Sequence, residues 1–265
     1  MFVDRAILLL MKNLNRKIFG LVAVVIVVAV GAVAVPWIYI NLVKQDAPEA
    51  LTLDSAVSTI VSTTAPSTLS STASTTLEPV VSTTVVPEII EASALDGDWA
   101  VVEKSVVGYR VKEVIIGQST EGVGRTSAVV GSLTIVDDEV TSAKFTVDMT
   151  TLKSDSSRRD RQVDTRILDT ITYPTATFAL KKPIKLTPEA IAGGVLSVKT
   201  TGTLTLRGVT RDIDFTLNAR LVENVIEVNG SILLVFADWL IPDPSISAIV
   251  VEDRGQLEFL IRFSR

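Results

Sequence analysis

The alternation of apolar and polar side chains in the second half of the chain most constrains its fold. Between residues 201 and 221, Leu204 and Leu206 alternate with threonines, and after a turn Phe215 and Leu217 alternate with polar residues. A period of two places successive side chains on opposite faces of a β-strand. The apolar faces must therefore point either at each other or at something bound between them.

The same alternation recurs about eight times between residues 98 and 265, with turn signals between the repeats. Many short strands of this kind are typical of a sandwich or a barrel. We predict an all-β fold, an antiparallel eight-stranded barrel, because closure removes open edges while each strand keeps one wet and one dry face. The stretch 154–174 interrupts the alternation with apolar residues at helical spacing among charges, which predicts one short helix before Tyr173-Pro174.

The inward-facing side chains of these strands form the candidate interior. A barrel of this size either is filled by its own side chains or holds one small ligand, and alternation alone does not distinguish the two. Inward glycines at Gly131, Gly202 and Gly230 indicate free space, a bend or a close strand approach. The predicted lining, which would also contact a ligand, consists of Val107, Tyr109, Val111, Leu133, Phe145, Val147, Phe178, Leu204, Phe215, Leu217, Ile232, Leu234, Phe259 and Ile261.

An uncharged apolar run at residues 18–40 predicts a single transmembrane helix. Basic residues concentrate in residues 1–17, so the positive-inside rule places the N-terminus in the cytoplasm and the barrel outside the cell membrane, in an extracellular or periplasmic space. The alternative is a cleaved signal peptide with Ala32-Val33-Ala34 before the cut. The apolar run continues to Ile40, which favours an anchor.

Residues 41–97 are dominated by serine and threonine with scattered proline. Such a segment buries too little apolar area to offset its ordering entropy, so we predict a disordered linker or stalk. Attached O-linked sugar and an unmodified spacer remain open alternatives. The predicted organisation is a basic N-terminus at 1–17, a membrane span at 18–40, a linker at 41–97 and a barrel at 98–265.

The composition excludes several classes of chemistry. The chain has no cysteine and no histidine, which removes disulfides, thiolate zinc sites, cysteine nucleophiles and histidine-based triads. The formal net charge of −5, without a basic patch that carries aromatic residues, argues against nucleic-acid binding. We predict no enzymatic activity, no catalytic residue, no cofactor and no metal site.

A dense cluster of charges at 158–169 leaves three hypotheses open. The simplest is a solvated helix face with Asp–Arg pairs. Alternatively, arginines near the barrel mouth contact a ligand's phosphate head group, and the candidates are Arg158, Arg159 and Arg161. A third hypothesis makes the carboxylates the acid and base of a hydrolase. Separately, Asp137-Asp138-Glu139 predicts a turn, with a weak divalent-cation site as the alternative.

Several motifs in order resemble one protein family. Trp99 begins the domain; the stretch 131–178 has a glycine-led strand, an Arg-Asp helix and Tyr-Pro; GTLTLRGVTRDIDFTLNARL begins at Gly202; and GQLEFLIRF, from Gly255, closes the chain. Together they resemble the YceI-like family of lipocalin-like barrels that bind polyisoprenoids. The resemblance covers roughly 98–265.

This resemblance implies an exported barrel with a long apolar tunnel that holds a linear isoprenoid, without catalysis. Family members often carry histidines near the first strand and before the Arg-Asp helix, and this chain has none, so a head group would need other partners. The prediction is a membrane-anchored module that sequesters or carries a polyisoprenoid or other long-chain lipid. The alternative is a filled, ligand-free barrel that serves as a structural or surface-interaction domain.

Overall fold

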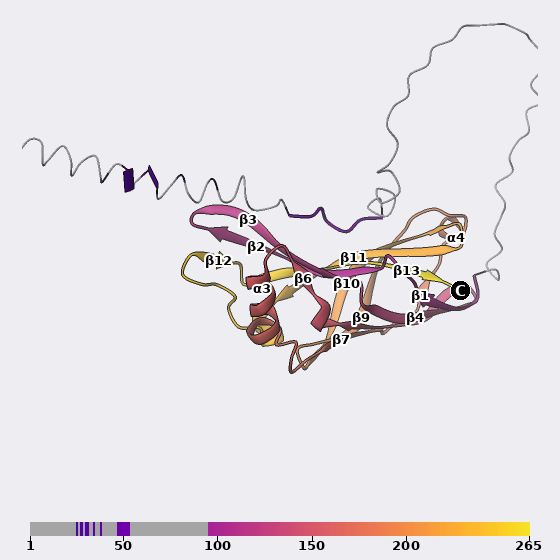
Figure 1. Cartoon of the computed structure of the whole chain (residues 1–265). Coiled ribbons are helices and arrows are strands. Elements are labelled where there is room, and N and C mark those ends of the chain that lie inside the picture. The colour runs from indigo at the N-terminus through magenta and orange to yellow at the C-terminus, as the bar shows by residue number, and fades with distance from the viewer. Residues whose placement is uncertain are drawn as a thin grey trace, which may run out of the picture.

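The computed structural model of the chain describes residues 47–53 and 95–265, with a few isolated positions between 25 and 38. The predicted basic N-terminus, most of the predicted span at 18–40 and most of the predicted linker lie outside the described residues. Within the described part, no helix is both long enough and apolar enough to cross a membrane. Figure 1 shows the described strands gathered into one elongated barrel, with α3 and β12 near one end and α4 near the other.

Short strands and helices follow one another from residue 97 to the end of the chain. In order they are β1 (Gly97–Val101), β2 (Val106–Ile115), β3 (Gln118–Thr126), β4 (Val129–Val136), β5 (Glu139–Asp148), η3 (Met149–Thr151), β6 (Lys153–Ser154), α3 (Ser157–Gln162), η4 (Val163–Ile167), β7 (Thr175–Leu180), β8 (Ile184–Lys185), α4 (Pro188–Ile191), β9 (Leu196–Leu206), β10 (Val209–Val222), β11 (Val225–Val235), η5 (Phe236–Trp239), β12 (Ile249–Val251) and β13 (Arg254–Ser264).

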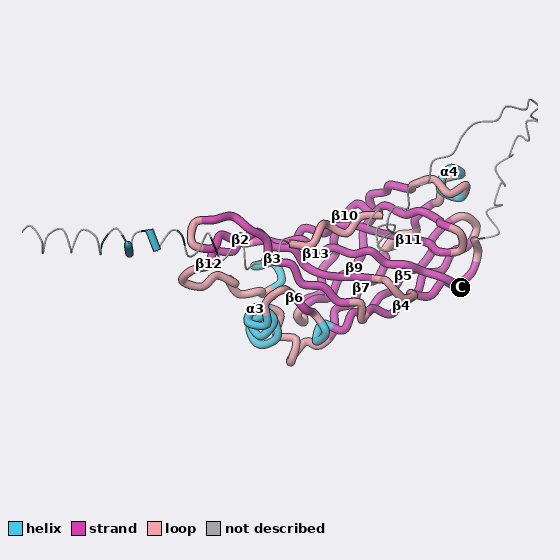
Figure 2. The backbone as a smooth tube through the Cα atoms, turned by 45° about the horizontal axis from the view of Figure 1, so that its top comes forward, coloured by secondary structure: helices cyan, strands magenta, loops and turns pink. Residues whose placement is uncertain are grey.

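Eight of these strands close into a ring, in the order β1-β4-β5-β7-β9-β10-β11-β13. The ring closes because β13 pairs with β1, and each neighbouring pair is antiparallel. The predicted eight-stranded antiparallel barrel is confirmed, and Figure 2 shows its strands wrapping around a common axis. The edge of β13 that pairs with β1 also pairs with β2, through residues 256–260, and this pairing lengthens that side of the barrel.

Strand β3 was not predicted, because its sequence lacks a regular apolar face. Its glycines accommodate neighbouring side chains instead. A Cβ on Gly122 would lie 3.1 Å from Nε of Arg159 on α3, and one on Gly124 would overlap the ring of Tyr109 on β2. The glycines of β3 are therefore explained by the side chains of Arg159 and Tyr109 that pack on them. These residues lie elsewhere in the chain, so the sequence of β3 alone does not reveal the strand.

The predicted short helix between residues 154 and 174 is present as α3, followed by the π-helical turn η4. The hydroxyl of Ser156 accepts a hydrogen bond from the backbone N–H of Arg159, as an N-cap residue does. Val163 is the buried residue that anchors the following turn to the barrel. A further one-turn helix, α4, was not predicted, and Thr187 caps it by accepting from the N–H of Ala190.

Five phenylalanine rings form a continuous row inside the barrel. The ring centroids of Phe145 and Phe263 are 5.6 Å apart, although their strands, β5 and β13, are not neighbours, so this contact crosses the interior. The row continues from Phe145 through Phe178 and Phe215 to Phe259, with centroid separations of 5.8, 5.7 and 5.9 Å. Tilted and edge-on pairs at such separations are favourable beyond the area they bury.

The three inward glycines make room for this row. A Cβ on Gly230 would lie 2.5 Å from the ring of Phe259, and one on Gly131 would lie 2.8 Å from the ring of Phe145. A Cβ on Gly202 would lie well inside 3.0 Å of the ring of Phe178. The sequence left open free space, a bend or a close strand approach; the structure shows in addition an aromatic ring close to each of the three glycines.

We expect Gly202→Ala to lower the free energy of unfolding by about 1–3 kcal/mol, because Phe178 is held between two other rings and has little freedom to withdraw. Phe178→Leu in the same chain should recover part of that loss. Ser197→Ala, an exposed position on the same strand, should change it by less than about 0.5 kcal/mol. Urea denaturation in detergent measures the parent chain, the three single variants and the double variant that carries both Gly202→Ala and Phe178→Leu. Additive effects of Gly202→Ala and Phe178→Leu would contradict a steric link between them.

Candidate functional site

The interior of the barrel is hollow. It encloses one continuous cavity of about 320 Å³, which lies in the range of small-molecule sites. The structure places all fourteen predicted lining residues along this cavity, and their contact with a ligand stays a prediction. By strand they are Val107, Tyr109 and Val111 on β2, Leu133 on β4, Phe145 and Val147 on β5, Phe178 on β7, Leu204 on β9, Phe215 and Leu217 on β10, Ile232 and Leu234 on β11, and Phe259 and Ile261 on β13.

The cavity extends along the barrel between its two ends. At one end it is bordered by Leu95, just before β1, and by Ile191 of α4. At the other end it is bordered by Arg158 of α3 and by Pro244 and Ile246, which lie between η5 and β12. Figure 1 shows α4 and α3 near opposite ends of the barrel, so the cavity is an elongated tunnel.

Charge is confined to few points of the lining, which is otherwise mainly aliphatic and aromatic. The charged residues that border the cavity are Glu113, Arg158, Arg159 and Arg220. Arg220 directs its guanidinium to Glu227, on the polar face of neighbouring strand β11. The other three gather around α3. Directional bonds to a guest are therefore available mainly at the α3 end, and the rest of the tunnel offers apolar contact.

A buried ion pair forms part of the α3 end. Nη2 of Arg159 donates to Oε1 of Glu113 at 2.8 Å, and the side chain of Glu113 is 3% exposed. Arg159 also pairs with Asp155, so two carboxylates offset its charge. Removing one member of such a pair leaves an uncompensated buried charge, which is strongly destabilising. Arg159 is thus committed to holding α3 against β2.

The side chain of Tyr109 lies beside this ion pair, and its pKa reflects how far the region is shielded from water. Burial raises the pKa of the Tyr109 phenol well above its usual value, against the opposing influence of nearby Arg159. The phenol is therefore neutral at every physiological pH. A neutral hydroxyl beside the apolar lining can donate or accept a single hydrogen bond without introducing charge.

The structure brings two of the three predicted head-group arginines to the cavity. Arg158 borders it and is exposed, and among the described residues it forms no ion pair. Arg159 borders it but is paired as above. Arg161 is exposed on the same helix and does not border the cavity. Arg158 is therefore the cation with the most freedom to bind an anionic group at the mouth.

The carboxylates of the hypothetical hydrolase are engaged in local hydrogen bonds. Oδ1 of Asp160 accepts from the N–H of Ser154 at 2.9 Å and from its hydroxyl at 2.6 Å. Asp164 accepts from the hydroxyl of Thr170 at 2.9 Å. These bonds fix the ends of the helical segment, which is a structural role.

The predicted turn at Asp137-Asp138-Glu139 is present between β4 and β5. Asp137 and Asp138 adopt positive φ angles of 49° and 63°, as a two-residue hairpin turn of the primed type requires. In the described part of the chain, no group of three or more acidic side chains is placed to hold a metal ion.

Sequence reasoning missed Glu113, Gln162 and the loop around Pro244 as parts of the site. A signal for Glu113 was present. It has the same parity as Val107, Tyr109 and Val111, so a continued strand places a carboxylate on the inward face. The loop carries no periodicity, and only the tertiary fold positions it over the cavity.

Comparison with curated proteins finds no match for this chain. Among solved structures, it is similar to a polyisoprenoid binding domain from Saccharophagus degradans implicated in plant cell wall breakdown, at 19% identity and a TM-score of 0.49, over 63% of this chain and 97% of that one. BcnA of Burkholderia cenocepacia matches at 15% identity and a TM-score of 0.45, over 59% of this chain and 95% of that one. The Campylobacter jejuni YCEI protein matches at 18% identity and a TM-score of 0.39, over 51% and 82%.

The family model of the YceI-like domain matches residues 99–263 of the chain. The match begins at Trp99 on β1 and ends at Phe263 on β13, the two strands whose pairing closes the ring. It therefore spans the whole barrel and more than half of the chain. The chain belongs to the YceI-like domain family.

Proposed function

We propose that this chain binds a polyisoprenoid or a comparable long apolar chain inside its barrel and carries or sequesters it without chemical change. The observation that carries the proposal is the elongated apolar cavity of about 320 Å³, with its charged groups concentrated around α3. Membership of the YceI-like family supports an isoprenoid as the guest.

The cavity supports a guest for a physical reason. Lining side chains that face empty space lack partner atoms, and they lose the dispersion contacts that a filled core has. A guest restores those contacts and removes its own apolar surface from water, worth about 25 cal/mol per Å². An apolar cavity of this kind takes up apolar molecules. A filled barrel with a purely structural role has no need of such a space.

The α3 end suits a polar head group. Arg158 is an exposed guanidinium at the mouth, and guanidinium groups bind phosphate with paired hydrogen bonds. A polyprenyl phosphate would place its tail along the phenylalanine row and its phosphate at Arg158. Burial of the tail then supplies affinity, and the arginine supplies orientation.

We place the barrel on the outer side of a cell membrane, held by residues 18–40 as a single span with a cytoplasmic N-terminus. The uncharged apolar run and the basic residues before it support this location. A tethered barrel exchanges its guest close to the bilayer, in contrast to a freely diffusing carrier.

The full chain, purified from cells, should yield a long-chain isoprenoid in an organic extract analysed by mass spectrometry. Ala143→Phe places a ring in the cavity and should lower the bound lipid at least about tenfold, because Ala143 is buried in the lining. Ala100→Phe, the same change at an exposed position on β1, should leave it unchanged. An empty extract, together with no uptake of added polyprenol by folded protein, would refute the proposal.

Arg158→Gln should weaken binding of a polyprenyl phosphate about two- to fivefold and leave binding of the neutral polyprenol unchanged, since an exposed ion pair contributes up to about 1 kcal/mol. Arg161→Gln removes the same charge from the same helix away from the cavity and serves as the control. Competition against a fluorescent lipid at two salt concentrations measures both. Equal effects of the two substitutions would show a general charge effect and no head-group site.

A further inference from the structure

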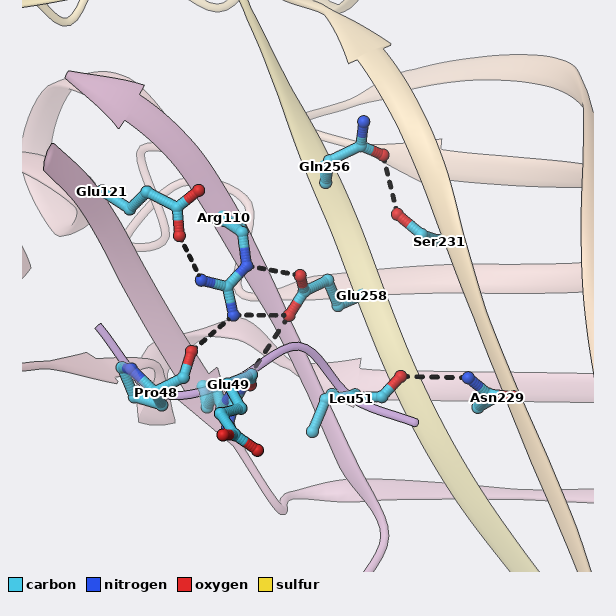
Figure 3. Close-up of polar contacts among 10 residues, drawn as sticks. Pro48, Glu49, Leu51, Arg110, Glu121, Asn229, Ser231, Gln256 and Glu258 are labelled. Carbon is cyan, nitrogen blue, oxygen red and sulfur yellow. Dashed lines mark hydrogen bonds and ion pairs between the residues drawn. The ribbon is translucent and has the colours of Figure 1, made fainter. Parts of the chain in front are cut away.

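A second binding surface, distinct from the cavity, lies on the outer face of the barrel. Part of the predicted linker occupies it. Residues Ala47–Leu53, within the segment predicted to be a disordered stalk, instead lie against strands β2, β13 and β11 (Figure 3). We call this segment the strap. Its occupancy explains why outward-facing residues of these strands are buried, although they lie on the polar side of the alternation.

The strap is held through its backbone. Nη2 of Arg110 donates to the carbonyl of Pro48 at 2.6 Å, and Nδ2 of Asn229 donates to that of Leu51 at 3.0 Å. Two further guanidinium groups donate to the strap. Arg125 donates to the carbonyl of Glu49, and Arg220 donates to the carbonyl of Leu53 at 2.6 Å. These donors come from four different strands and meet along one stretch of extended chain.

Buried carboxylates fix the donors in place. Oε1 of Glu258 accepts from Nε of Arg110 at 2.6 Å, and Glu258 is 5% exposed. Glu227, 6% exposed, pairs with Arg220 and with Arg262, each at 2.9 Å. Charge-assisted bonds of this kind orient a guanidinium before anything binds it. The surface is thus preorganised to receive carbonyl oxygens.

Apolar contact selects which segment docks. Leu260, on the outward face of β13, forms a cluster with Leu51 and Leu53 of the strap, and Val106 packs against it. Leu260 is only 4% exposed because the strap covers it. The leucines of the strap alternate with Thr52, whose side chain is exposed, so an extended conformation presents both leucines to the barrel.

We propose that this surface is a docking site for residues 47–53 and that docking sets how far the barrel reaches from the membrane. The reach, though not the docking, rests on the proposed function, in which residues 18–40 span the bilayer. With the strap docked, only residues 41–46 separate the span from the barrel, and they extend at most about 20 Å. With it released, residues 41–94 are available, about 180 Å when fully extended.

Docking is tested with two spin labels on the full chain, which has no native cysteine to remove. Glu49→Cys labels the exposed side of the strap and Leu233→Cys labels the exposed outer face of β11. Double electron–electron resonance should give a narrow distance distribution. Leu51→Asp with Leu53→Asp should broaden it and shift it to longer distances, whereas Thr52→Asp should not. A broad distribution without the strap substitutions, or no response to the paired aspartates, would overturn the docking.

A change on the barrel side provides an independent check. Asn229→Asp replaces the amide that donates to Leu51 with a carboxylate, which repels the carbonyl oxygen, and should also broaden the distribution. Ser231→Asp, two residues along on the same outward face, should leave it narrow. If neither or both of these substitutions broaden it, the assigned contact is wrong.

The reach is tested in lipid nanodiscs by energy transfer from a dye at Leu233→Cys to acceptor-labelled lipids. Transfer should be high in the parent chain and should fall at least twofold with Leu51→Asp and Leu53→Asp, but not with Thr52→Asp. Unchanged transfer would refute the proposal that docking sets the distance of the barrel from the membrane.

Measuring bound lipid on the same samples separates this inference from the proposed function. A loaded barrel with a broad distribution refutes the docking alone, and an empty barrel with a narrow one refutes the carrier alone.

Discussion

The pairing of β13 with β1 is the contact on which the rest of the structure depends. It joins β13 to β1, so the ring closes only when residues at the two ends of the barrel sequence meet. Closure removes the open edges that an antiparallel sheet would otherwise expose. It also creates the interior, since the apolar faces of an open sheet would enclose nothing. Closure by long-range pairing is slow to form, because the intervening chain must be ordered first.

Strand β13 is used on both of its faces. Its inward residues Phe259, Ile261 and Phe263 face the cavity, and Glu258 and Leu260, which point outward, lie beneath the strap. An ordinary strand of an antiparallel barrel has one dry face and one wet face. Here both faces are dry over several residues, which is visible as an unbroken run of buried positions from Glu258 to Ile261.

The sequence predicts the ring and its lining because both depend on local alternation. Parity along each strand separates inward from outward residues, and all fourteen predicted lining residues do border the cavity. It does not predict the strap, because the contact between Leu51 and Asn229 joins residues that are far apart in the chain and have no shared pattern. Leu260 was the available sign, an apolar side chain at an outward position. Single exposed apolar residues are common, so that sign alone carries little weight.

The alternation of apolar and polar residues also could not predict the volume of the cavity. The same inward residues can fill a barrel or line one, and the difference depends on how the rings lie. Gly202 and Gly230 leave no Cβ beneath Phe178 and Phe259, so these rings settle against the wall of the barrel. The contact between Phe145 and Phe263 crosses the interior of the barrel. Charge gathers at the α3 end, at Glu113, Arg158 and Arg159. A guest with one polar end would therefore favour the direction that places its head group at the α3 end, because burying that group among the phenylalanine rings would leave it without a hydrogen-bonding partner.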